Sequence, residues 1–175
     1  MCIRDRFYTL FKADPYGVNS VFSPINLVAA TDAQPGLLPF AARASNMVRY
    51  RTPAIADFYA DIAYAPGEAS AANHRSGTLH GGSLSWGRKP YYVGYAFQRA
   101  RSGSAAAPVA EPSTSTYQAL SAAYDWEAIG LQLYANYVRN SSSLPGVPSA
   151  KLASLGLTYN ITPASNLMFE AMQRK

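Results

Sequence analysis

From residue 46 onward, hydrophobic and polar residues alternate along segments of about ten residues, and turn residues separate these segments. Alternation with a period of two is typical of β-strands, whose successive side chains point to opposite faces. In segment 128–139, one face would carry Ile129, Leu131, Leu133, Ala135 and Tyr137, and the other Gly130, Gln132, Tyr134 and Asn136. The pattern predicts eight strands, at residues 46–52, 55–65, 77–87, 90–100, 116–126, 128–139, 150–160 and 165–174.

The connections between these segments alternate between short and long. The short ones are Pro53-Ala54, Lys89, Glu127 and residues 161–164. The long ones are residues 66–76, 101–115 and 140–149, which are rich in Ser, Ala, Gly, Asn and Pro. Short turns at one end of the strands and long loops at the other are typical of outer-membrane β-barrels, in which the long loops are extracellular.

Aromatic residues on the apolar faces gather near the ends of the predicted strands. Near the short turns lie Tyr50, Phe58, Trp86, Tyr91, Trp126 and Tyr159; near the long loops lie Tyr64, Phe97 and Tyr137. Aromatic belts at both membrane interfaces produce this distribution. A soluble sandwich also alternates, but nothing in its core moves aromatic residues to strand ends. The sequence therefore predicts an all-β fold, an antiparallel up-and-down transmembrane β-barrel in the bacterial outer membrane.

The composition agrees with strands that face lipid on one side. Hydrophobic residues make up 49% of the chain and charged residues only 14%, against about 25% in soluble domains. The net charge of +5 does not gather into a basic stripe, so we expect no nucleic-acid partner. Cys2 is the only cysteine, and His74 and His80 lack a second ligand at metal spacing. We therefore expect no cofactor and no metal, and because we find no catalytic motif, no enzymatic activity.

The polar faces carry charged residues that could line a water-filled pore. On strands these are Arg49, Arg51, Asp57, Asp61, Asp125, Glu170 and Arg174, whereas we expect the apolar faces to hold none. A charge on a lipid-facing strand costs about 2–4 kcal/mol at the bilayer midplane. The predicted pore-lining and selectivity residues are Arg49, Arg51, Asp57, Asp61, Glu170 and Arg174, together with Lys12 and Asp14 from the preceding segment.

Arg49 and Arg51 lie two residues apart and therefore share one strand face. One interpretation is a positive patch that attracts anions, because arginine stays protonated at every relevant pH. The other is that both are solvated on the water side and paired with Asp57 and Asp61 of the neighbouring strand. From the first interpretation we expect a mild preference for anions.

The chain divides into three parts. Residues 1–6 resemble a non-native leader, and we expect the chain to be part of a longer protein. Residues 7–45 are irregular and are expected to lie on the concave side of the sheet as a pore-constricting loop. Residues 46–175 are expected to form the transmembrane strands, with Tyr91, Val93, Tyr95, Phe97, Leu131 and Leu133 exposed on the convex surface.

Three short motifs resemble the general porins of beta-proteobacteria. Asn46-Met47-Val48-Arg49-Tyr50 resembles that family's Asn-Ser-Val-Arg-Tyr strand. The segment Pro90-Tyr91-Tyr92-Val93-Gly94-Tyr95-Ala96-Phe97-Gln98 is similar to its Pro-Leu-x-Val-Gly-Ala-Ala-Tyr-Gln strand. Asp14-Pro15-Tyr16-Gly17, before an Asn-containing stretch, is similar to the Asp-Pro-Phe-Gly of its third loop.

The resemblance implies a sixteen-stranded barrel that assembles as a homotrimer in outer-membrane lipid and passes small hydrophilic solutes and ions by passive diffusion. Residues 7–45 would be the third loop, which folds inward and narrows the pore. The chain departs from the family pattern because it lacks the strands before that loop, the remaining strands and the terminal aromatic residue. Its loop also carries few acidic residues, Asp14 and Asp32.

Two other functions remain open. One is a substrate-specific channel of similar build, and the other is a small eight-stranded barrel with a filled interior, serving as an anchor or adhesin. Small inward residues argue against a filled interior, because they suit a wide lumen. They are Gly81, Ser83, Gly94, Ala96, Ser121, Gly130, Ser154 and Gly156.

Overall fold

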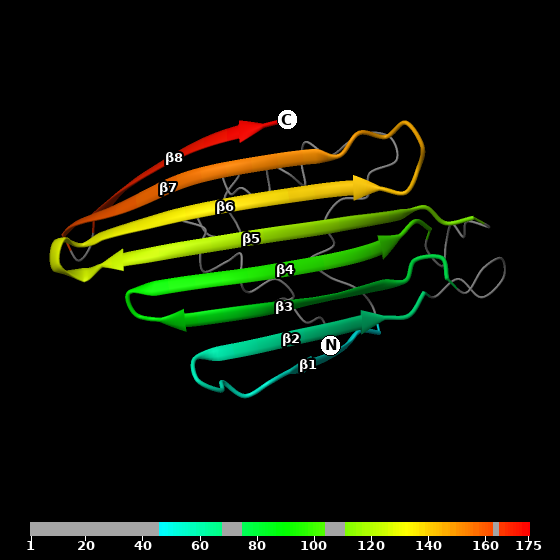
Figure 1. The fold of residues 1–175 in the computed structure, drawn as a ribbon, viewed down its shortest axis with the longest axis horizontal. Helices are drawn as coiled ribbons and strands as arrows, with labels where there is room; N and C mark the ends of the chain where they lie inside the picture. The colour runs from blue at the N-terminus through cyan, green and yellow to red at the C-terminus, as the bar shows by residue number, and fades with distance from the viewer. Residues whose placement is uncertain (1–45, 68–74, 104–110, 163–164) are drawn as a thin grey trace.

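A computed structural model describes residues 46–67, 75–103, 111–162 and 165–175 of the chain, and these residues form one curved β-sheet (Figure 1). The eight strands are antiparallel and stand in the order β1 to β8, so that each pairs with its neighbour in sequence. They are β1 (Val48–Arg51), β2 (Phe58–Ala65), β3 (Leu79–Arg88), β4 (Tyr91–Arg101), β5 (Thr114–Trp126), β6 (Leu131–Ser142), β7 (Ala150–Thr162) and β8 (Ser165–Arg174). The predicted all-β fold and its eight strands are confirmed.

The only helical element in these residues is η1, a single 3-10 turn at Glu127–Ile129. None of the described residues belongs to a helix that is long and apolar enough to cross a bilayer.

The first hairpin turn is not where the sequence predicted it. Instead of Pro53-Ala54, the turn is formed by Ala56 and Asp57, whose φ angles are 49° and 67°. Ile55 and Phe58 exchange two backbone hydrogen bonds of 2.9 Å around them. Positive φ at both central residues is the type I′ geometry that matches the twist of antiparallel strands. Asp57 therefore lies in the turn, and its assignment to a polar strand face is wrong.

The same shift moves Tyr50 away from the turn. Tyr50 lies opposite Ile62, which is four residues away from Phe58, the residue at the turn end of β2. The prediction that Tyr50 belongs to the aromatic group at the turn end is therefore wrong.

The double substitution A56N/D57G, which introduces the asparagine-glycine pair favoured in type I′ turns, is expected to stabilise the hairpin by about 1–2 kcal/mol. Ala56 and Asp57 occupy the left-handed region, which costs an ordinary residue about 1–2 kcal/mol and costs glycine almost nothing. Urea unfolding of the detergent-refolded A56N/D57G variant measures the gain. Ala54→Gly is the control, because Ala54 does not have a positive φ; equal stabilisation by that change would contradict the assignment of the turn.

The turn between β5 and β6 also differs from the predicted single residue Glu127. Residues Glu127–Ile129 form η1, and Gly130 follows it in the left-handed conformation with φ 66°. Strand β6 consequently begins at Leu131, and Ile129 does not belong to its apolar face. The turn between β3 and β4 consists of Lys89 and Pro90, since Arg88 pairs directly with Tyr91.

Short turns and longer connections lie at opposite ends of the strands, here named the turn end and the loop end (Figure 1). At the turn end, the carboxylate of Glu127 accepts a hydrogen bond from the ammonium group of Lys89 and raises the pKa of Lys89. This contact joins two neighbouring turns.

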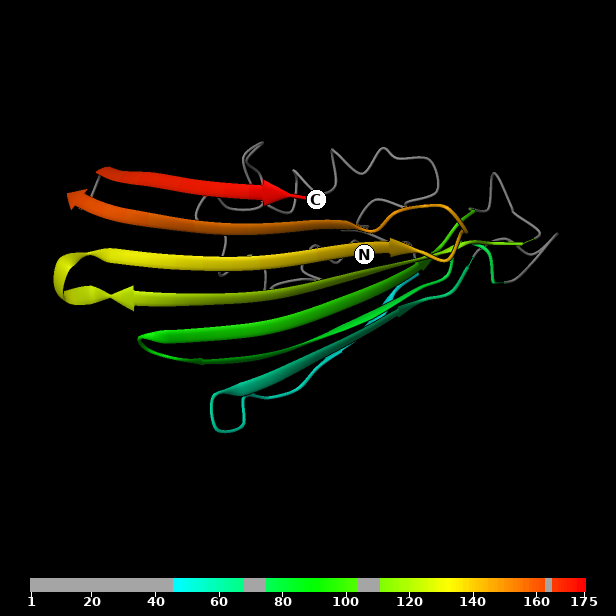
Figure 2. The same cartoon turned by 45° about the horizontal axis from the view of Figure 1, so that its top comes forward.

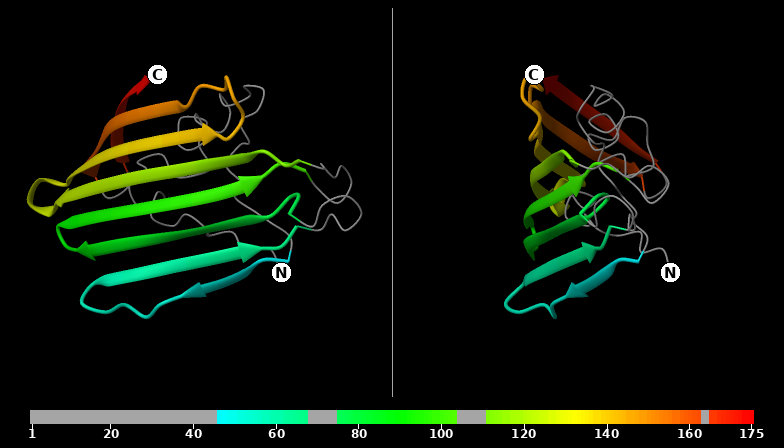
Figure 3. Two further views of the ribbon diagram at one scale, coloured as in Figure 1. Left: turned by 45° about the vertical axis from the view of Figure 1, so that its right-hand side comes forward. Right: turned by 90° about the vertical axis from the view of Figure 1, so that its right-hand side faces the viewer.

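The sheet is bent into a trough, as Figures 2 and 3 show, with β1 and β8 curving toward the same side. Within the described residues β1 and β8 pair only with β2 and β7, so the sheet has two edges. If the chain is half of a barrel wall, its sheet is expected to be curved but open.

The convex face carries the large apolar side chains. Of the six residues expected there, Tyr91, Val93, Tyr95, Phe97 and Leu133 have exposed fractions between 37% and 54%. The sixth, Leu131, is half-buried. The residues that alternate with them in β4 are buried: Tyr92 is 8% exposed, Ala96 0% and Gln98 2%. The predicted orientation is therefore confirmed, because an inverted soluble barrel would bury the first set.

Three aromatic ring pairs lie at the turn end of the convex face. Their ring centroids are 5.3–6.4 Å apart. The pairs are Phe58 with Trp86, Tyr91 with Tyr124, and Tyr124 with Trp126. These aromatic contacts agree with the belt predicted at that end.

The expectation that the apolar faces hold no charge is wrong at the strand ends. Cross-strand partners share a face of the sheet. Arg99 pairs with Thr116, Arg139 pairs with Gln118, and Lys151 pairs with Arg139. All three basic residues therefore fall on the convex face. Arg88, which pairs with Tyr91, lies on it at the turn end. The cost of a lipid-facing charge falls to about 0–1 kcal/mol near the interfaces, so the exclusion applies only to the middle of the strands.

Candidate functional site

The concave face is lined by polar side chains of modest size. The buried polar residues on it are Asp61, Ser85, Gln98, Ser115, Ser121, Asn136, Asn140, Ser154 and Thr158. One row crosses six strands: Tyr59, Ser85, Gly94, Ser121, Asn136 and Ser154 pair in succession from β2 to β7. Within it, the amide nitrogen of Asn136 donates to the Ser154 hydroxyl at 3.3 Å. Together these side chains offer hydrogen-bonding groups along the concave wall.

The concave face also has an apolar part, which the alternation did not predict. Ala96, Tyr117, Ala119, Val138 and Leu152 form a buried hydrophobic cluster, with Met172 packed against it. The members come from five neighbouring strands, β4 to β8. The lining is therefore divided into polar and apolar regions and is not uniformly hydrophilic.

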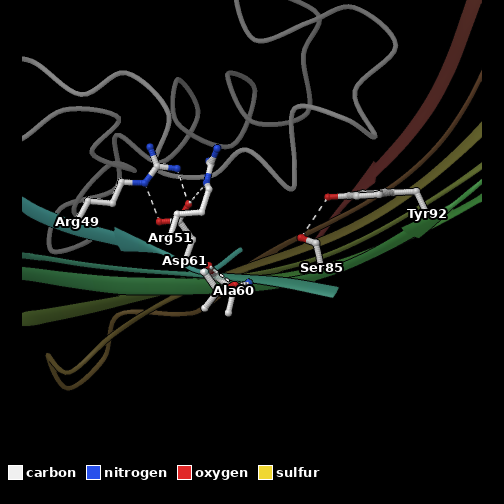
Figure 4. Close-up of polar contacts among 7 residues, drawn as sticks. Arg49, Arg51, Ala60, Asp61, Ser85 and Tyr92 are labelled. Atoms are coloured by element: carbon white, nitrogen blue, oxygen red, sulfur yellow. Dashed lines mark hydrogen bonds and ion pairs between the residues drawn. The ribbon is translucent and has the colours of Figure 1, made fainter. Parts of the chain in front are cut away.

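An ionic triad of two arginines and one aspartate lies on the concave side of β1 and β2 (Figure 4). The guanidinium group of Arg49 donates from Nε to Oδ1 of Asp61 at 2.6 Å, and its Nη2 contacts Oδ2 of the same carboxylate. Arg51 donates from Nε to Oδ2 at 2.9 Å. The arrangement follows from the register, because Arg51 stands directly opposite Asp61 while Arg49 stands two residues away.

The triad carries more positive than negative charge. Two guanidinium groups face one carboxylate, so the three groups together carry a formal charge of +1. Asp61 is 5% exposed and Arg49 10%, whereas Arg51 is 42% exposed. On the concave side of the sheet, Arg51 therefore exposes more of its cationic side chain than Arg49 does.

The triad unites parts of both interpretations of Arg49 and Arg51. Both arginines pair with Asp61, which is one of the two acidic residues of the neighbouring strand that the second interpretation expected. Asp57 lies in the turn. The triad still has a formal charge of +1. This charge has the sign that the first interpretation expected, but it is smaller than that of two unpaired arginines.

The other predicted site residues do not join this triad. Glu170 and Arg174 lie on the concave face of β8, at the opposite edge of the sheet, where they pair in register with Gly156 and Leu152. Both carboxylate oxygens of Glu170 are buried. Lys12 and Asp14, and the expectation that residues 7–45 lie against the concave wall, fall outside the described residues.

A row of alternating small and large residues lies nearer the turn end. Gly87, Tyr92, Ala123, Tyr134, Gly156 and Glu170 pair in succession from β3 to β8. A side chain at Gly87 would meet the Tyr92 ring at 3.3 Å, so that ring lies against the wall over the glycine. The Tyr92 hydroxyl lies 3.5 Å from that of Ser85 (Figure 4), and the Tyr134 hydroxyl donates to Oε1 of Gln132 at 2.6 Å.

Tyr92 and Tyr134 border a hollow of about 280 Å³, together with Ala123, Asp125 and Gln132. The spacing of these two tyrosines along the chain does not show that they lie two strands apart in one row; the register of the strands shows it. Among the described residues, no group of three His, Cys, Asp or Glu side chains could hold a metal ion.

The comparisons with known proteins agree with this geometry. The family model for Gram-negative porins matches residues 3–174 of the chain. A search of the curated proteins found no match.

Proposed function

Because the chain belongs to the Gram-negative porin family, we propose that its sheet forms part of a channel wall through which small hydrophilic solutes and ions diffuse passively. The family places the protein in the bacterial outer membrane as a porin. The further step, weakly selective passive diffusion, is supported by the contrast between the two faces of the sheet. The convex face exposes large apolar side chains, and the concave face gathers small polar ones.

We also propose that the eight strands are about half of a sixteen-stranded wall, and that the complete porin is a trimer. Strand edges in a bilayer need partners, because water is absent there to satisfy backbone groups. The edges at β1 and β8 support the proposal that further strands complete the barrel. A small closed barrel acting as an anchor or adhesin would instead require β1 to pair with β8.

Residues 7–45 are proposed to act as the pore-constricting loop. Their sequence includes Leu27, Leu37, Leu38 and Phe40, which need burial. The apolar cluster on the concave face supports this proposal, because apolar groups in a water-filled lumen would otherwise face water.

A substrate-specific channel is the second candidate, and the hollow beside Tyr92 and Tyr134 favours it. Aromatic rings with neighbouring polar groups can bind a flat or sugar-like solute. The two candidates differ in whether transport depends on the size of the solute or on its identity.

Liposome swelling with sugars of increasing size distinguishes them. We expect the swelling rate to fall with solute size and to be equal for stereoisomers, and the single-channel conductance to rise linearly with KCl concentration. Tyr134→Ala should leave the order of the sugars unchanged. A conductance blocked by one sugar, with relief of the block in Tyr134→Ala, would support the substrate-specific channel. Swelling no faster than in protein-free liposomes would refute both.

A further inference from the structure

The hollow beside Tyr92 and Tyr134 lies on the concave side of β3 to β6, near the turn end. Its volume of about 280 Å³ is close to the lower limit of about 300 Å³ for ligand pockets, so it suits a small ligand. The hollow follows from the register, because Gly87 and Ala123 alternate with the two tyrosines in one row and leave space beside the rings.

The two tyrosines supply apolar surface to this hollow. The ring of Tyr92 lies over Gly87, and the ring of Tyr134 belongs to the same row two strands away. Their hydroxyl groups are directed toward protein oxygens, that of Tyr92 toward Ser85 (Figure 4) and that of Tyr134 toward Gln132. A ligand in the hollow therefore meets the aromatic rings and not the phenol protons.

Asp125 gives the hollow a negative charge. Its side chain is half-buried on the concave face, opposite Gln132, and the ion pairs within the described residues do not include it. Lys89 also borders the hollow, but its ammonium group donates to Glu127. Two carboxylates therefore face one ammonium group, and the three groups together carry a formal charge of −1.

The charge of Asp125 acts on cations at this place. The hydrogen bond and charge of Glu127 and, to a smaller extent, the charge of Asp125 raise the pKa of Lys89. The same field would attract a cation in the hollow and repel an anion. The hollow thus combines a carboxylate with two aromatic rings, which are the two kinds of group that bind an organic cation.

We propose that the hollow binds small organic ammonium ions that carry an aromatic ring. The ammonium group donates to the carboxylate of Asp125, and the apolar body lies against the rings of Tyr92 and Tyr134. A charge-assisted hydrogen bond is about twice as strong as a neutral one, so a neutral solute of the same shape binds more weakly. The cationic triad lies on β1 and β2, so the wall attracts ions of opposite sign at separate places.

The inference rests on the proposed position of the concave face in a water-filled channel, and it adds a binding site to passive diffusion. Saturation-transfer NMR titrations of the complete porin in detergent test it with three probes of similar shape, phenethylammonium, 2-phenylethanol and phenylacetate. Phenethylammonium should bind at least about tenfold more tightly than the other two, because it alone donates a charge-assisted hydrogen bond to Asp125.

Substitutions in the hollow separate the role of the charge from that of the ring. D125N should weaken the binding of phenethylammonium about tenfold, whereas D125E should keep most of the affinity. Y134L should weaken binding about threefold, whereas Y134F should leave it unchanged, because the cation meets the ring and not the hydroxyl group. All variants should retain the native circular dichroism of β-strands, which shows that they fold.

D57N is the matched control, because it also removes one carboxylate from the turn end. Asp57 precedes β2, three strands from Asp125 in β5 and thus about 14 Å away at the usual strand spacing. This distance exceeds the screening length of about 8 Å at physiological salt, so D57N should change binding by less than about twofold. Asparagine also tolerates the positive φ of this position.

Equal affinity of the native porin for the three probes would overturn the proposal without any substitution. Equal loss of affinity in D125N and D57N would overturn it as well. Because the titrations measure binding and liposome swelling measures transport, a failure of this site differs from a failure of passive diffusion.

Discussion

The substitution Ala122→Arg is expected to destabilise the folded protein by about 2–4 kcal/mol, which is the cost of a charge on a lipid-facing strand near the bilayer midplane. Ala122 lies on the convex face of β5, opposite Val93 on one side and Ala135 on the other. It is four residues from Trp126 in the aromatic group at the turn end. The guanidinium group would therefore lie in the middle of the apolar surface. Urea titration of the protein refolded into vesicles measures the change.

The adjacent residue provides a matched control. Ala123 has the same side chain and, like Ala122, is half-buried, but it lies on the concave face between Tyr92 and Tyr134. The hollow of about 280 Å³ beside it gives room for a longer side chain. Ala123→Arg should cost less than about 1 kcal/mol, because its charge reaches water. Equal destabilisation by both substitutions would contradict the assignment of the convex face to lipid.

Removing the arginines of the triad is expected to lower the permeability ratio of chloride to potassium about fourfold. In R49A/R51A the formal charge of the triad changes from +1 to −1. One unit charge about 8 Å from a permeating ion contributes about 0.2 kcal/mol after screening at physiological salt. Two charges therefore change the energy of each ion by about 0.4 kcal/mol, with opposite signs for anions and cations. Reversal potentials of the complete porin across a KCl gradient measure the ratio.

A charge series makes this test more stringent. Asp61→Asn raises the formal charge of the triad to +2, and R49A/R51A/D61N brings it to zero. We expect the preference for chloride to decrease from Asp61→Asn to the native protein, then to the triple variant, and finally to R49A/R51A. A native channel that prefers cations, or a ratio that does not change in R49A/R51A, would refute the proposed anion preference.

Local sequence patterns predicted the strands and their faces, because both depend on residues that are close together in the sequence. The alternation in β4 and β6 identified which side chains meet lipid, since a period of two assigns faces without knowledge of the partner strand. The spacing of the segments likewise predicted the order of short turns and long loops. The first turn was misplaced because Pro53 is a strong turn signal, whereas Ala56 and Asp57 adopt positive φ against their intrinsic preference.

Contacts between strands required the tertiary structure. The sequence indicated that Arg49, Arg51 and Asp61 share a face, but the register of β1 against β2 placed Asp61 opposite Arg51 and within reach of Arg49. The same holds for Arg139 and Lys151, which are twelve residues apart in the chain and directly opposite in the sheet. A slip of one residue would move every side chain of a strand to the other face. The sequence by itself thus determined what each strand presents to lipid and to water, whereas the hydrogen-bond ladders between strands decided which charges meet, because only they fix the register.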